Sequence, residues 1–247
     1  MKILMMVFNQ VSQGTYWRAF HLASELVKRG HSVTLMATSR RKRQGLLIRN
    51  ENGVSIVETP DLFSGMLRSG WDLWNTLNRI FWLRKQKYDL VHAFESRPTV
   101  IFPSLYIHNK HVPLVMDWAD WFGKGGSVEE RANPVIRSIL RPIETFFEVH
   151  YRNKANGTTV ICSCLYEKAI QLGISPENIL YLGNGADINQ LASIPVNSAR
   201  EKLGLPINIP IIGYVGTIFR KDANFLINAF ERVLSLNPEA HLLIAGY

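Results

Sequence analysis

An α/β fold built on a parallel sheet is what this 247-residue sequence predicts. Short runs rich in β-branched residues alternate with longer amphipathic stretches, the pattern of a buried sheet covered by helices. The composition agrees, because 47% hydrophobic and 19% charged residues are enough for a substantial core without disulfides or metals. The chain is also longer than one average domain.

The expected elements follow one another from the N-terminus. The first strand, Lys2–Phe8, is an apolar run broken by Asn9 and Gln10, which favours a buried strand over a signal peptide. A helix over Tyr16–Arg29 carries apolar side chains at helical spacing, and Gly30 supplies its stop. Further strands are expected at Ser32–Ala37, Val54–Glu58, Leu90–Ala93, Leu114–Asp117, Thr158–Cys162 and Ile179–Leu182.

A second unit is expected after a polar linker, Asn184–Pro210, which holds a short helix at Ser198–Leu203. Its elements are a strand at Ile211–Val215, a helix at Asn224–Leu236 and a strand at His241–Ala245. We place the domains at 1–205 and 206–247. A lone strand–helix–strand unit leaves a sheet edge unpaired, so we expect an incomplete second domain. The alternative is that these strands extend the first sheet.

The net charge and the cysteines indicate which partners and which cellular compartment to expect. A net charge of +8 implies attraction to something anionic, which leaves nucleic acid, phospholipid head groups and a phosphate-bearing substrate open. Cys162 and Cys164 are too close in sequence for an unstrained disulfide, which fits a reducing compartment. We therefore expect a cytoplasmic protein.

Two loops at strand ends are candidate sites. Gly14 and Thr15 lie where the first strand passes into a helix, and such a helix N-terminus can hold an anion. The loop lacks the G-x-G-x-x-G spacing of a dinucleotide site, so the glycine could equally serve the turn.

The second loop follows the strand Leu114–Asp117 and is rich in glycine and aromatic residues. Asp120 is the candidate catalytic residue, because its carboxylate could orient or deprotonate an acceptor hydroxyl. Trp118 or Trp121 could stack on a sugar ring, and Lys124 could meet a phosphate. Asp117 completes this candidate acceptor site. The alternative is a packed aromatic turn with carboxylates that cap the next helix.

Short motifs in a consistent order carry a resemblance to a known family. They are Gly14 with Arg18, Leu22 and Leu26; Arg29–Thr34 ("R-G-H-x-V"); Asp89–Ala93 ("D-V-V-H-A"); Val112–Val115 ("V-P-L-V"); Val160–Ser163; Asn184–Asp187 ("N-G-V-D"); and Gly213–Gly216 with Lys221, Ala229 and Phe230. Together they resemble glycosyltransferase family 4.

The resemblance implies a GT-B architecture, in which two Rossmann-like domains face a cleft. The first domain would be complete and hold the acceptor, and the second, which holds the nucleotide sugar, would be cut off soon after it begins. Gly216 would let its backbone approach the donor diphosphate, and Lys221 would neutralise the diphosphate charge. The family's later glutamate-bearing donor segment has no counterpart here, so we expect this chain alone to be inactive.

Two positions depart from the family pattern. Thr217 stands where the family usually has arginine, and Arg220 is the alternative source of that charge. Ala119 stands where the family commonly has histidine. The aspartates Asp117 and Asp120 are separated by two residues and so do not form the D-x-D metal motif of the other glycosyltransferase fold. We predict no metal and no cofactor beyond the nucleotide sugar.

A membrane contact is a further expectation. The stretch Met66–Lys87 carries Leu67, Trp71, Trp74, Leu77 and Phe81 at helical spacing, with Arg68, Arg79, Arg84, Lys85 and Lys87 nearby. With Arg40–Arg43 it could form a basic face for anionic lipid at the inner face of the membrane. The alternative is that the stripe is core or lines a substrate groove.

The leading hypothesis is therefore a glycosyltransferase, retaining as the family is, that moves a sugar from a nucleotide donor to a glycan or lipid-linked acceptor in polysaccharide or glycolipid biosynthesis. The second hypothesis is a non-catalytic fragment that binds an acceptor or partner without turnover. A nucleic-acid-binding protein is the third and least favoured, because the arginines are scattered and no nucleic-acid module is recognised.

Overall fold

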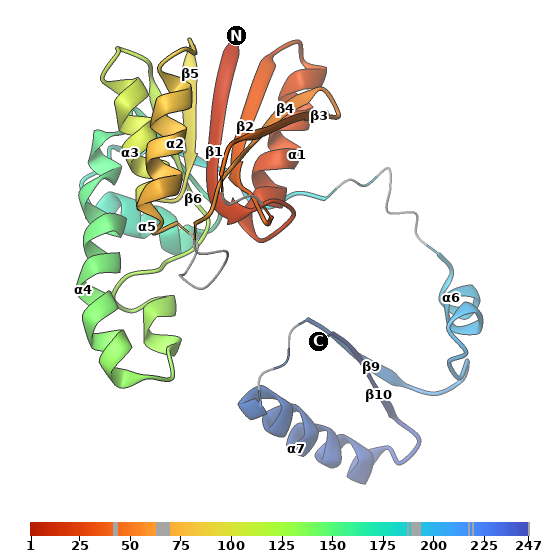
Figure 1. Cartoon of the computed structure of the whole chain (residues 1–247). Coiled ribbons are helices and arrows are strands. Elements are labelled where there is room, and N and C mark those ends of the chain that lie inside the picture. Colours follow the sequence, from red (N-terminus) through yellow and green to blue (C-terminus); the bar gives the residue numbers. More distant parts are fainter. Residues whose placement is uncertain are drawn as a thin grey trace. The chain divides into compact units, whose positions relative to one another are not determined.

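A computed structural model describes residues 1–41, 44–62, 70–186, 188, 194–216, 218 and 220–246, without the side chains of Arg220 and Lys221. The chain forms two compact units, Met1–Gly185 and Ala186–Tyr247 (Figure 1). The boundary expected at residue 205 falls inside the second unit. Its short helix α6 (Val196–Lys202) groups with the strands that follow it.

The first unit is built on an eight-stranded sheet in the order β3-β4-β2-β1-β5-β6-β7-β8. All neighbouring strands are parallel except β3, which runs antiparallel to β4. This confirms the α/β fold class. The strands are β1 Lys2–Gln10, β2 Ser32–Thr38, β3 Leu47–Glu51, β4 Val54–Thr59, β5 Leu90–Phe94, β6 Leu114–Trp118, β7 Gly157–Val160 and β8 Ile179–Tyr181.

Helices cover both faces of this sheet (Figure 1). Helix α1 (Thr15–Lys28) packs Tyr16 and Phe20 on one face, and Gly30 follows it with φ 85°, as expected for a helix stop. The helices α2 and α3 pack on the other face. The remaining bounds are α2 Leu73–Leu83, α3 Pro98–His108, α4 Pro134–His150, α5 Ser163–Gln171 and the 3-10 turns η1 Ser127–Glu130, η2 Arg152–Lys154 and η3 Pro176–Asn178.

Strand β3 was not expected from the sequence. Its residues, Leu47 to Glu51, include three polar side chains, and none of the five is buried. It lies at the sheet edge and pairs only with β4, so it has no apolar run or clean alternation to reveal it.

Helix α2 is amphipathic as expected, but Arg79 was wrongly assigned to its basic outer face. Arg79 is fully buried and donates to the carbonyl oxygens of Val7 and Thr99 at 2.9 and 3.1 Å. Burial lowers the pKa of this guanidinium to about 9. The apolar side chains Leu73, Trp74, Leu77 and Phe81 of the helix are exposed, and so are Arg84, Lys85 and Lys87, which follow it. Lys42, Arg43, Met66, Leu67 and Arg68 lie outside the described residues.

The second unit contains a parallel pair of strands, β9 (Ile211–Val215) and β10 (His241–Ala245), with helix α7 (Arg220–Leu236) between them in sequence. These strands form their own sheet, so the alternative that they extend the first sheet is wrong. Several apolar side chains of this unit are exposed, among them Val215 at 85%, Phe225 at 76% and Leu236 at 88%.

No helix in the described part of the chain is long and apolar enough to cross a membrane.

Candidate active site at the carboxyl edge of the sheet

The loop Ala119–Gly126, called the site loop below, leaves the carboxyl end of β6. Because β1, β5, β6 and β7 are parallel, their carboxyl ends lie along one edge of the sheet. Sites of open α/β sheets form at this edge. The sequence correctly predicted the strand from which the loop starts, although β6 continues through Trp118.

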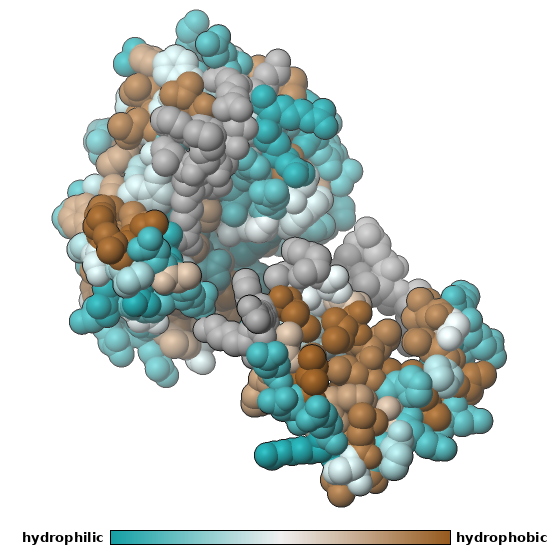
Figure 2. Space-filling view, turned by 60° about the horizontal axis from the view of Figure 1, so that its bottom comes forward, coloured by the Kyte–Doolittle hydropathy of each residue, from teal (hydrophilic) through white to brown (hydrophobic). Residues whose placement is uncertain are grey.

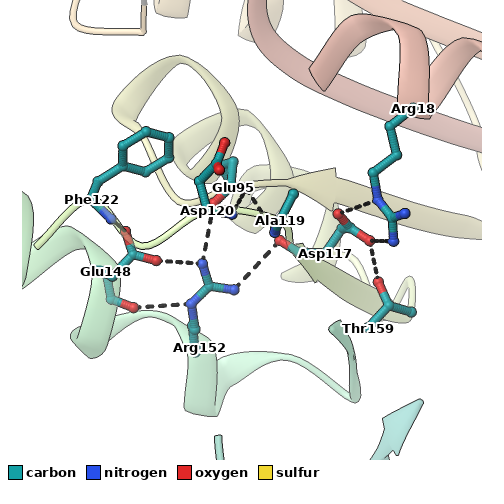
Figure 3. A network of polar contacts seen from close by, with 9 residues as sticks. All are labelled: Arg18, Glu95, Asp117, Ala119, Asp120, Phe122, Glu148, Arg152 and Thr159. Atoms are coloured by element: carbon teal, nitrogen blue, oxygen red, sulfur yellow. Dashed lines mark hydrogen bonds and ion pairs between the residues drawn. The ribbon is translucent and has the colours of Figure 1, made fainter. Parts of the chain in front are cut away.

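Glu95 fixes the start of the site loop (Figure 3). It follows β5 and its side chain is fully buried. Its Oε1 accepts hydrogen bonds from the backbone N–H groups of Ala119 at 2.9 Å and Asp120 at 3.1 Å. Its backbone has φ 70°, a left-handed conformation that costs energy for a residue with a Cβ. The contact therefore holds the loop at the expense of local backbone strain.

Arg152 lies between two buried carboxylates, those of Glu95 and Glu148 (Figure 3). Its Nη2 is 2.6 Å from Glu148 Oε1 and 3.5 Å from Glu95 Oε2. The guanidinium also lies over the Trp118 ring, 3.8 Å from its centroid. Burial and the neighbouring Glu148 raise the pKa of Glu95 well above its ordinary value, and burial raises the pKa of Glu148. Arg152 thus pairs with two buried carboxyl groups, and the charge of Glu148 makes ionisation of Glu95 less favourable.

Asp117 is held by Arg18 of α1 through two hydrogen bonds, at 3.0 Å to Oδ1 and 2.8 Å to Oδ2. Thr159 donates to the same Oδ2 at 2.5 Å. Arg18 also donates to the carbonyl of Leu182 and to Oδ1 of Asn184. Asp117 is fully buried, and both oxygens have protein partners. The Arg18–Asp117 pair therefore ties together α1, β6, β7 and the segment after β8.

Asp120 is the exposed carboxylate of the loop. Partial burial raises its pKa, and the charge of Arg97 opposes that rise. Arg97 is 4% exposed and lies between the rings of Phe8 and Phe122, with its Cζ atom 4.1 and 4.4 Å from their centroids. The loop therefore presents one carboxylate to solvent beside a cation stacked between two aromatic rings.

Trp118 at the end of β6 and Trp121 of the site loop have different environments. Trp118 is fully buried in a cluster with Val160 and Leu165. Trp121 is partly exposed, and its Nε1 donates to the carbonyl of Lys124 at 2.8 Å. The Nζ atom of Lys168 lies 4.2 Å from the centroid of the Trp121 ring. Lys124 itself is exposed.

Gly14 and Thr15 form the N-terminus of α1 at the carboxyl end of β1. Gly14 has φ 51°, and a Cβ at this position would lie 2.6 Å from Nδ2 of Asn9. No side chain caps this helix end. The N–H groups of Tyr16 and Trp17 already donate to the carbonyls of Gln13 and Gly14, at 3.1 and 3.2 Å, so few donors of this helix end are left for an anion.

The predicted donor residues lie in the second unit. Gly216 has φ 146°, and its backbone N–H donates to the carbonyl of Ala245 at 3.0 Å. Arg220 and Lys221 begin helix α7, and their side chains lie outside the described structure. Among the described residues, no group of three or more His, Cys, Asp or Glu side chains is arranged to hold a metal ion.

Sequence reasoning missed Glu95, Arg97 and Arg152 as residues of the site. Glu95 and Arg97 follow β5, and a polar residue directly after a buried strand was an available signal. Arg152 lies in η2, far along the chain from both, and has no local sequence signal.

Comparison with known proteins gives a consistent result. Residues 14–190, more than half of the chain, match the family model described as Glycosyltransferase Family 4. A relative from Escherichia coli (strain K12), named as colanic acid biosynthesis glycosyl transferase WcaI, is 30% identical over 120 residues. That match covers 47% of this chain and 26% of the relative.

Solved structures resemble the fold along nearly the whole chain. A sucrose-phosphate synthase from Thermosynechococcus elongatus matches with a TM-score of 0.64 at 15% identity, over 98% of this chain and 61% of that protein. A glycosyltransferase from Rickettsia africae matches with a TM-score of 0.57 at 14% identity, over 99% of this chain and 68% of that protein. HepE from Anabaena, in complex with UDP-glucose, matches with a TM-score of 0.59 at 14% identity, over 99% and 69%. The chain thus has the fold of part of these larger proteins.

Proposed function

Because the chain belongs to glycosyltransferase family 4, we propose that it is the acceptor-side part of an enzyme that transfers a sugar from a nucleotide sugar. The acceptor is a hydroxyl group of a glycan or a lipid-linked glycan. The anomeric configuration is retained, as the family resemblance implies. The observation that carries this proposal is the single exposed carboxylate, Asp120, on a loop fixed at the carboxyl edge of the sheet.

Asp120 orients the acceptor hydroxyl and accepts its proton as the acceptor oxygen bonds to the anomeric carbon. The bond from that carbon to the diphosphate oxygen breaks, the nucleoside diphosphate leaves with the electron pair, and attack on the face that it leaves from retains the configuration. A general base works best when its pKa approaches the working pH, and partial burial raises the pKa of Asp120 in that direction. Its backbone N–H is fixed by Glu95, so little ordering of the loop is needed when the acceptor binds.

The acceptor lies beside Trp121 and Lys124. The partly exposed Trp121 ring stacks on a sugar, and Lys124 pairs with a phosphate of the acceptor. The N-terminus of α1 at Gly14 and Thr15 holds a further anionic or hydroxyl group. Asp117 and Trp118 were predicted to touch the acceptor, but their complete burial supports a different role, which is to hold the loop in place.

The second unit contributes the first contacts to the nucleotide sugar. Gly216, Arg220 and Lys221 follow β9 at its carboxyl end, where a diphosphate binds in folds of this class. Support comes from HepE, whose solved structures hold UDP and UDP-glucose. Fixed cations there would stabilise the charge that develops on the leaving nucleoside diphosphate.

A non-catalytic acceptor-binding fragment is the second candidate. The observation that favours it is the exposure of apolar side chains over the second unit, such as Val215 and Phe225. Such a surface is not that of a finished nucleotide-sugar pocket.

Transfer assays separate the two candidates. The 247-residue chain and, where its reading frame continues, the longer product (the complete gene product) are each incubated with a panel of radiolabelled nucleotide sugars and a membrane and glycan extract from the source organism. Label that enters the glycolipid or glycan fraction only with the complete product supports the proposal. If the complete product transfers label from none of the donors, the transferase proposal is rejected and the binding fragment is favoured.

A further inference from the structure

Helix α4 turns its acidic side chains inward and its apolar side chains outward. Glu144 and Glu148, the only carboxylates of this fully described helix, are 3% and 1% exposed and pair with Arg131 and Arg152. A water-facing helix normally has the reverse pattern. The outward side chains, which we call the α4 apolar face, are Val135, Ile136, Ile139, Ile143 and Phe146, each between 39% and 65% exposed.

Figure 2 shows hydrophobic residues on the left side of the first unit, the side on which α2, α3 and α4 lie in Figure 1. Exposed apolar side chains in one continuous row mark an interaction surface, whereas scattered ones are ordinary. The row follows a 17-residue helix, which corresponds to a length of about 25 Å.

The groups beside the α4 apolar face are mainly cationic. The side chain of Arg141 is 45% exposed and pairs with Glu129 at 2.8 Å, while Lys124 is exposed. Arg137 donates to the backbone carbonyl of Glu129, and the ring of His150 stacks on Phe146 at 4.7 Å. An apolar row edged by cations, in a chain of net charge +8, complements a surface that is apolar inside and anionic outside.

We propose that the α4 apolar face lies on an anionic lipid bilayer. Its apolar side chains enter the boundary between head groups and acyl chains, and Arg141 faces lipid phosphates. The sequence placed this contact at residues 66–87 and 40–43, and there Trp74, Leu77 and Phe81 are exposed together with Arg84, Lys85 and Lys87. The α4 apolar face is a further exposed row of the same unit, which was not predicted from the sequence. The proposal concerns attachment only and does not depend on which sugar is transferred.

The same surface is joined to the site loop. A groove of about 600 Å³ is lined by Lys124 of that loop and by Arg141, Thr145, Phe146 and His150 of α4. The backbone N–H of Lys124 donates to Oγ1 of Thr145 at 2.8 Å. Gly123 approaches α4 so closely that a Cβ there would lie 2.9 Å from the Cα of Thr145. A lipid held at α4 would therefore place its phosphate at the end of the loop that carries Asp120.

Vesicle sedimentation tests the proposal. The chain is mixed with vesicles of phosphatidylcholine alone, or with about 30% phosphatidylglycerol, an anionic lipid. We expect binding to the anionic vesicles only, weakened by salt. Ile139→Asn should reduce the partition coefficient about tenfold, since an apolar side chain no longer enters the lipid. Ile139→Leu should retain binding.

The matched control is Ile48→Asn on β3. Ile48 and Ile139 are 56% and 58% exposed, so both substitutions remove a similar exposed side chain, and β3 lies at the opposite sheet edge from β8. Ile48→Asn should bind like the unchanged chain, and thermal unfolding should be similar for both variants.

Three results would overturn the proposal. The first is the absence of binding to anionic vesicles, and the second is equal binding by the Ile139→Asn variant. The third is a dimer, seen by light scattering, that Ile139→Asn dissociates without any change in vesicle binding. That last result would assign the α4 apolar face to a second copy of the chain.

Discussion

Glu95 Oε1 accepts the backbone N–H of Asp120 at 3.1 Å, although the two residues lie 25 positions apart in sequence. The contact joins the residue after β5 to the loop after β6. It explains how an exposed aspartate can have a defined position. The buried carboxyl group of Glu95 holds the backbone of Asp120, and the Asp120 side chain stays in solvent.

Replacement of Glu95 by glutamine should flatten the dependence of stability on pH. Burial and Glu148 raise the pKa of Glu95 above its ordinary value of 4.5 in the folded chain. Because the pKa of Glu95 is higher in the folded chain than in the unfolded chain, its contribution to the free energy of unfolding is complete below pH 4.5. This contribution is lost as the pH rises through the pKa of the folded chain. The loss approaches about 1.4 kcal/mol per pH unit for one proton.

Urea unfolding between pH 4 and 8 provides the measurement, with tryptophan fluorescence as the signal. All 6 tryptophans lie in the first unit, so this signal reports that unit alone. In Glu95→Gln, the amide oxygen of the new side chain can still accept both loop N–H groups. Glu167→Gln, at an exposed position, is the control. If the free energy of unfolding changes with pH equally in Glu95→Gln and in the unchanged chain, the raised pKa assigned to Glu95 is contradicted.

Loss of the Arg18–Asp117 pair should destabilise the first unit strongly. Asp117→Asn leaves Arg18, whose side chain is 9% exposed, with no carboxylate among its described partners. Breaking one half of a buried pair costs about 3–5 kcal/mol in the free energy of unfolding. Glu25→Gln removes the exposed pair with Lys28 and should cost less than about 1 kcal/mol. Similar losses in the two variants, measured by urea unfolding, would show that burial of the pair is unimportant.

This 247-residue chain should bind nucleotide sugars weakly. The second unit leaves Val215 85% exposed, and the N–H of Gly216 already donates to Ala245. Titration calorimetry with UDP-glucose should give a dissociation constant weaker than about 1 mM, or no heat. Micromolar binding would contradict this prediction, because it would show that the residues of this chain alone make enough contacts to hold the nucleotide sugar.

The sequence predicted those parts of the fold that depend on local pattern. The apolar runs identified seven of the eight strands in the first sheet, and Gly30 marked the end of α1. The sequence did not reveal β3, an edge strand with three polar residues and no buried side chain, which has neither an apolar run nor an alternating pattern. The position of Arg79 was also wrong. Its helical spacing is that of a surface residue, but its guanidinium donors found carbonyl and hydroxyl oxygens in the core.

The candidate site was predictable only as a strand end. A glycine-rich loop after a buried strand indicates where a site lies, and Asp120 is exposed there as the hypothesis requires. Which aspartate faces solvent could not be read from sequence, because Asp117 is buried by Arg18 and Thr159 from distant segments. Arg152 is likewise recruited from η2 by packing against Trp118. Such contacts depend on the tertiary fold.

Turnover of Asp120→Asn is the most direct test of the proposed chemistry. In the complete gene product, with the donor found by the panel assay, kcat/KM should fall about 10²–10⁴-fold as the general base is lost. The free energy of unfolding should change by less than about 0.5 kcal/mol, because the side chain is exposed. The acid limb of the pH profile should lie above 3.8, the ordinary pKa of this carboxyl group, and should disappear in the variant. Glu130→Gln, an exposed carboxylate in η1, should leave kcat/KM unchanged. Equal kcat/KM values for Asp120→Asn, Glu130→Gln and the unchanged enzyme would contradict the assignment of Asp120 to the reaction.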